Sequence, residues 1–137
     1  MRSIIVDAGP LIALFRKHDR HHSRVKRFLA TAPGRFVSTL PVVTEVCYFL
    51  DARGKRAFLT WIRRGGLALQ PITLEDLDDI AAIIARYEDR EMDFADATLV
   101  WLAGLVNTLD VLTIDRKDFQ VYRAASGKPF NLVLGKS

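Results

Sequence analysis

Short apolar runs alternate along the chain with longer segments of helical periodicity. Strands are predicted at residues 3–6, 35–38, 67–71, 110–114 and 131–134. Helices are predicted at residues 10–17, 19–32, 41–51, 55–64, 73–87 and 93–106. Strands that alternate with helices in this way are typical of a parallel sheet covered by helices on both faces. The pattern therefore predicts an α/β fold built on a central parallel sheet of five strands.

Four acidic residues stand in or against apolar sequence. Asp7 ends the first predicted strand and Asp115 ends the fourth, whereas Glu45 and Asp96 lie on apolar helices. Burying an ionised carboxylate without a partner is costly because the charge loses its hydration. A hard divalent cation is a partner that several carboxylates can share. Because the functional crevice of a parallel sheet lies beyond the carboxyl ends of its strands, we expect these acids to form one site.

Each acid also has a simpler interpretation. Asp7 is equally well placed to cap the helix that follows it. Asp93 and Asp96 lie one helical turn apart, so we expect Asp93 to cap the helix and Asp96 to bind a ligand, although the roles could be reversed or shared. The solvated-face interpretation fits Glu45 poorly, because a helix that is apolar on most faces is a buried helix. Asp118 is expected to be a surface or capping residue.

Composition narrows the class of protein. The chain has 137 residues, half of them hydrophobic and 26% charged, which predicts one globular domain over residues 1–137. A net charge of +4 and an isoelectric point near 9.5 make an acidic polymer a plausible partner. A single cysteine excludes an internal disulfide. The first strand begins too early to leave room for a signal peptide, and no apolar run approaches a membrane span, so we expect a cytoplasmic protein with no membrane contact.

Other catalytic chemistries find little support in the sequence. There is no convincing Ser/His/Asp or Cys/His constellation, and the paired glycines Gly65 and Gly66 precede a strand rather than forming a Walker A loop. His18, His21 and His22 lie in a densely charged stretch that fits a solvated basic face better than a zinc site. The clustered carboxylates remain the best candidates for chemistry.

Four segments resemble, in order, the motifs of the PIN-domain family, and in particular of its VapC toxins from toxin–antitoxin pairs. They are residues 4–14, 38–46, 92–100 and 112–119. The resemblance covers essentially the whole chain and implies a three-layer α/β/α sandwich around a five-stranded parallel sheet. It also implies a Mg²⁺- or Mn²⁺-dependent ribonuclease that is often dimeric and is held inactive by a cognate antitoxin.

The resemblance also implies roles for individual residues. By motif position, the catalytic acids would be Asp7, Glu45, Asp96 and Asp115. We expect Asp7 and Asp96 to bind the principal metal ion, supported by Asp93 and Thr113, and RNA to be cleaved by a water that the metal activates. Without metal, four ionised acids would repel one another, so at least one pKa should be raised. Contacts to the RNA backbone are expected from Arg16, Lys17, Arg20, Arg116 and Lys117.

Two alternatives remain open at this point. A phosphatase of the haloacid dehalogenase type would carry a second acid two residues after the first, where this chain has Gly9. A non-catalytic module that binds RNA or a partner protein on the same fold is also possible, although four intact acids argue against it.

Overall fold

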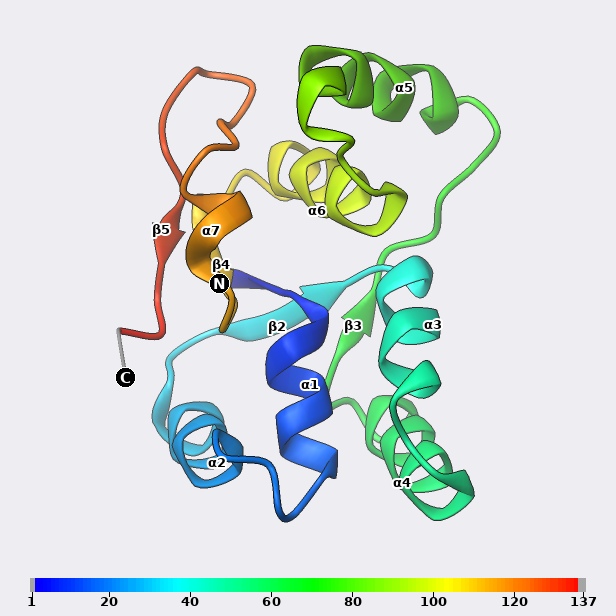
Figure 1. The fold of residues 1–137 in the computed structure, drawn as a ribbon, viewed down its shortest axis with the longest axis vertical. Helices are drawn as coiled ribbons and strands as arrows, with labels where there is room; N and C mark the ends of the chain where they lie inside the picture. The colour runs from blue at the N-terminus through cyan, green and yellow to red at the C-terminus, as the bar shows by residue number, and fades with distance from the viewer. Residues whose placement is uncertain (1, 136–137) are drawn as a thin grey trace.

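The computed structural model describes residues 2–135 and contains one sheet with helices on both faces (Figure 1). The strands are β1 (Ser3–Val6), β2 (Arg35–Ser38), β3 (Ala68–Leu69), β4 (Asp110–Leu112) and β5 (Asn131–Leu132). Their order in the sheet is β3-β2-β1-β4-β5, and every neighbouring pair is parallel. The predicted α/β fold with a five-stranded parallel sheet is confirmed.

The helices fall into two groups. They are α1 (Ala8–Phe15), α2 (His22–Thr31), α3 (Leu40–Tyr48), α4 (Ala52–Arg63), α5 (Asp76–Arg86), α6 (Phe94–Leu105) and α7 (Arg116–Phe119), with a 3₁₀ turn η1 (Glu88–Arg90). The chain moves from β1 out to β3 and then returns to β4 and β5. Right-handed crossovers therefore place α1 to α4 on one face of the sheet and α5 to α7 on the other. In Figure 1 the sheet passes between α1 and α2 on one side and α5 and α6 on the other.

Strand β1 occupies the centre of the sheet and of the hydrophobic core. Ile4, Ile5 and Val6 are completely buried, and Ile5 pairs with residues of both β2 and β4. The strand order reverses between β1 and β4, so a crevice opens where the connections that leave these two strands run to opposite faces of the sheet. The Asp7 amide still donates to the Leu112 carbonyl at 3.0 Å, which fixes these two strand ends beside each other.

The boundaries of several elements differ from the prediction. The helix expected at residues 73–87 begins at Asp76, whose carboxylate accepts hydrogen bonds from the amide and the hydroxyl of Thr73 at 2.7 and 2.9 Å. Thr73 therefore donates to the first residue of the helix and does not act as its N-cap. The helix expected at residues 41–51 ends at Tyr48, and Asp51 instead caps α4 by accepting from the Gly54 amide at 2.7 Å.

Candidate metal centre

A cavity of about 280 Å³ opens at the carboxyl ends of β1 and β4, and we name it the acid pocket. Its acidic lining residues are Asp7, Glu45, Asp93, Asp96, Asp115 and Asp118. The structure therefore brings together all four acids that the sequence singled out, although they are spread over more than a hundred residues of chain. Asp118, which we predicted to lie on the surface or to cap a helix, also lines this pocket.

Asp7 follows β1 directly and uses both of its carboxylate oxygens. Oδ1 accepts from the Ala8 amide at 2.8 Å, so Asp7 does cap α1, and Oδ2 accepts from the Thr113 hydroxyl at 2.8 Å. Burial raises the pKa of Asp7 above its usual value, and the neighbouring carboxylates of Asp93 and Asp115 raise it further against the lowering effect of these two bonds. Thr113 therefore holds the Asp7 side chain in place.

Asp93 and Asp96 have different surroundings at the start of α6. Asp93 is the N-cap, and its Oδ1 accepts from the Asp96 amide at 2.8 Å. Asp96 is only 8% exposed, and its Oδ2 accepts from the Tyr122 hydroxyl at 2.9 Å. Burial, followed by the charges of Asp7 and Asp93, raises the pKa of Asp96 to about 8, even though the bond from Tyr122 lowers it. Repulsion between the acids thus adds to the effect of burial at Asp96, as it does at Asp7.

Glu45 lies on α3 at the border between core and solvent. Val42, Val43 and Val46 are buried, but Tyr48 is 82% exposed and Phe49 is 49% exposed. The prediction that this helix is buried on most faces was therefore wrong, because one side of it is open. Glu45 is half-buried, and burial together with the charges of Asp7 and Asp93 raises its pKa.

The last two acids lie at and on α7, a helix of four residues that was not predicted from the sequence. Asp115 caps this helix, accepts from the Lys117 amide at 3.2 Å and is exposed. Asp118 forms an ion pair with Arg90 at 3.0 Å. Because so short a helix has no measurable apolar period, nothing in the sequence indicated that Asp118 turns towards the pocket.

The donor chemistry of the acid pocket fits a hard divalent cation. The six acidic side chains that line it offer carboxylate oxygens, which bind Mg²⁺ and Mn²⁺ better than they bind soft metals. Among the six acids, Asp118 alone has a cationic partner within residues 2–135. In the same part of the chain, no three His, Cys, Asp or Glu side chains are already gathered at ligand spacing. The pocket therefore offers the right atoms, and a bound cation would offset the repulsion that contributes to the raised pKa values of Asp7, Glu45 and Asp96.

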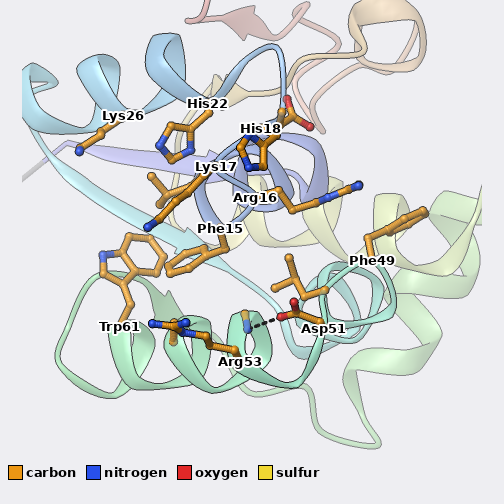
Figure 2. A pocket seen from close by; sticks show the side chains of 15 residues that line it. Phe15, Arg16, Lys17, His18, His22, Lys26, Phe49, Asp51, Arg53 and Trp61 are labelled. Atoms are coloured by element: carbon orange, nitrogen blue, oxygen red, sulfur yellow. Dashed lines mark hydrogen bonds between the residues drawn. The ribbon is translucent and has the colours of Figure 1, made fainter.

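A second and larger cavity of about 1180 Å³ lies between the end of α1, the start of α2 and α4, and we name it the basic groove (Figure 2). Phe15 and Trp61 lie in contact in this cavity, with ring centroids 5.5 Å apart. Its cations are Arg16, Lys17, Lys26 and Arg53. Within the described residues none of these four forms an ion pair. Phe49 lines both cavities, so the basic groove adjoins the acid pocket.

The basic residues predicted to contact RNA are not equivalent in the structure. Arg16 and Lys17 line the basic groove, whereas Arg20 and Lys117 are exposed elsewhere. Arg116 donates to the Leu134 carbonyl at 2.8 Å, so its guanidinium is engaged in joining α7 to the end of the sheet. This bond uses one of the five N–H groups of the guanidinium, and a contact between Arg116 and the RNA backbone stays a prediction.

The histidines do not form a metal cluster with the acids. His18 and His22 line the basic groove, and the Nδ1 atom of His22 lies 2.8 Å from the Ala13 carbonyl oxygen. This hydrogen bond links α2 to α1, which gives His22 a structural role.

The chain is similar to known proteins in both sequence and structure. The family model described as PIN domain matches residues 4–124. The chain is similar to the ribonuclease VapC26 of Mycobacterium tuberculosis, with 27% identity over 134 residues that cover 95% of this chain and 99% of that protein. It is also similar to the crystal structure of M. tuberculosis VapC20, a toxin that cleaves the sarcin–ricin loop. That comparison has a TM-score of 0.70 and 25% identity, and it covers 82% of this chain and 89% of the other. No helix within residues 2–135 is long and apolar enough to cross a membrane.

Proposed function

The chain belongs to the PIN-domain family, and from this premise we propose that it is a metal-dependent endoribonuclease that cleaves single-stranded regions of RNA. The observation that carries the proposal is the gathering of six carboxylates in the acid pocket, one of them buried with a pKa of about 8. The names of its relatives support the same activity, since one is called a ribonuclease and the other is described as a toxin that cleaves the sarcin–ricin loop.

The acids would divide the catalytic work according to their surroundings. Asp7 and Asp96 would hold Mg²⁺ or Mn²⁺, because each has one carboxylate oxygen fixed by a hydroxyl group. When bound, the metal would supply an activated water and offset the charge of the scissile phosphate. Glu45 and Asp115 border the same pocket and would orient the attacking water by accepting its hydrogen bonds.

Cleavage of RNA by the purified protein tests this proposal. We expect a labelled single-stranded RNA to be cut in the presence of Mg²⁺ or Mn²⁺, a matching duplex to be cut much more slowly, and EDTA to stop the reaction. Denaturing gel electrophoresis measures all three. Cleavage that persists in EDTA would contradict the metal mechanism, and binding without cleavage under either metal would favour a non-catalytic module on the same fold.

We also propose that the ribonuclease is a toxin controlled by a small antitoxin protein. The basic groove offers a surface for such a partner, because its four cations, which form no ion pair within residues 2–135, surround apolar side chains that suit an acidic amphipathic segment. Asp19 and Asp51 offset part of this charge, so the four cations and two acids of the groove leave a formal excess of two positive charges. Because Phe49 borders both cavities, a segment seated in the groove would crowd RNA at the acid pocket.

Expression of the chain alone should arrest growth, and co-expression of a small protein encoded beside it should relieve the arrest. Reversing two groove charges, with Lys26→Glu and Arg53→Glu, should leave RNA cleavage intact and weaken relief by the antitoxin about tenfold or more. The matched control is Lys55→Glu with Arg56→Glu, which makes the same charge change at exposed positions of α4 outside the groove. Growth curves and inhibition of cleavage in vitro measure the effect, and equal inhibition of both double variants would argue against the groove.

A homodimer is the remaining proposal. Exposed apolar side chains on α3 and α4 support it, since Leu40 is 63% exposed, Tyr48 82% and Leu59 50%. Large side chains of this kind mark protein interfaces when they gather on one region of the surface.

A further inference from the structure

Tyr122 holds a carboxylate of the acid pocket from within the core, as Thr113 does for Asp7. It is 2% exposed, and its hydroxyl donates to Oδ2 of Asp96 at 2.9 Å. Among the described residues this is the single hydrogen bond that reaches the Asp96 side chain. Because a carboxylate has two oxygens, the bond leaves Oδ1 available to the pocket that Asp96 lines.

The surroundings of Tyr122 allow its ring little freedom. Its ring makes edge contacts with Tyr87 and Phe119 at centroid distances of 5.0 and 5.2 Å. The next residue, Arg123, donates from Nη1 to the carbonyls of Gln120, Val121 and Tyr122 at 2.8, 3.1 and 3.0 Å. The Arg123 amide also donates to the Tyr87 hydroxyl at 2.8 Å. Ring and backbone are thus both fixed, which is what a residue that orients another side chain requires.

We propose that Tyr122 is a positioning residue for the metal: its hydroxyl fixes the carboxylate of Asp96 so that one oxygen faces the acid pocket. The inference rests on the proposed metal-dependent function but concerns a residue outside the acidic set. Residues that orient metal ligands by hydrogen bonding typically affect metal affinity by about 10- to 100-fold. The competing interpretation is that Tyr122 is an ordinary core aromatic whose hydroxyl contributes only to stability.

The test compares Tyr122→Phe with Tyr87→Phe, a matched control in the same aromatic cluster whose hydroxyl accepts from a backbone amide instead of contacting an acid. Calorimetric titration with Mn²⁺ should give about tenfold weaker binding for Tyr122→Phe and unchanged binding for Tyr87→Phe. Cleavage by Tyr122→Phe should recover at high Mn²⁺ concentration. Equal effects of both variants on affinity, or no effect of either, would overturn the proposal.

A measurement on the unaltered protein guards against a variant that fails to fold. The chain has three tyrosines, so labelled tyrosine rings give few signals. On titration with Mg²⁺, the ring signals of Tyr122 should shift more than those of Tyr87 and Tyr48, and shifts confined to the other two rings would contradict the proposal. If the unaltered protein binds Mn²⁺ but cleaves no RNA, the proposed function is contradicted and the role of Tyr122 can still stand. If the unaltered protein cleaves RNA and Tyr122→Phe binds Mn²⁺ as tightly as it does, the role of Tyr122 is contradicted and the proposed function stands. An unaltered protein that binds no Mn²⁺ would overturn the positioning role in every case.

Discussion

Asp7→Asn is expected to reduce RNA cleavage by about 10³-fold or more while leaving the protein folded. The amide oxygen of asparagine can still accept from the Ala8 amide, and its NH₂ group can donate to the Thr113 hydroxyl, so both contacts of Asp7 are kept. What is lost is the negative charge that would hold the metal. Initial rates of cleavage at saturating Mg²⁺, together with the circular dichroism spectrum, measure the two halves of this expectation.

The matched control for this substitution is Asp79→Asn, which removes one carboxylate from an exposed position of α5. It should cleave RNA at the unaltered rate. An Asp7→Asn protein that retains more than about a tenth of the unaltered rate at every Mg²⁺ concentration would remove Asp7 from the catalytic set.

Asp96→Asn is expected to stabilise the metal-free protein at alkaline pH even though it should abolish cleavage. The pKa of Asp96 rises from 3.8 to about 8 on folding, so the folded state binds the proton more tightly than the unfolded state. The Asp96 carboxyl makes its full contribution to the free energy of unfolding below its pKa in the unfolded state, and this contribution is lost as the pH rises towards its folded-state pKa of about 8. Asparagine carries no such titration and can still accept from the Tyr122 hydroxyl.

Thermal unfolding in EDTA measures this effect. The Tm of the unaltered protein should fall as the pH rises from about 5 to about 8, and the Tm of Asp96→Asn should be about 10 °C higher at the upper end. The variant's profile should be flatter but not flat, because burial also raises the pKa values of Asp7 and Glu45. Added Mg²⁺ should raise the Tm of the unaltered protein alone. Superimposable profiles for the two proteins would contradict the assignment.

The sequence was sufficient to predict those parts of the fold that depend on local patterns. Strands β1 and β2 were predicted with their observed bounds, because each is a short run whose apolar residues are buried or half-buried within a parallel sheet. The meeting of Asp7 with Asp115 followed from the rule that parallel strands present their carboxyl ends at one edge. Element ends fixed by a single side chain were less predictable, as Asp51 and Asp76 illustrate.

The remaining parts of the site depend on contacts between distant segments. Tyr122 lies 26 residues from Asp96 in a stretch without helical or strand periodicity, so no pattern linked the two. The basic groove likewise exists because α1 and α4 cross and bring Phe15 against Trp61. The exposed side of α3 could not be foreseen either, because an apolar helix that borders a cavity has the same sequence pattern as one that is fully buried.

The bond between Thr113 and Asp7 joins residues that are 106 positions apart, and it has a consequence for biosynthesis. Strand β4 can pair with β1 only after both have left the ribosome, and Tyr122 emerges later still. A nascent chain therefore displays Asp7 long before Thr113, and Asp96 well before Tyr122. The acid pocket therefore cannot close during translation until residues as far as Tyr122 have emerged from the ribosome.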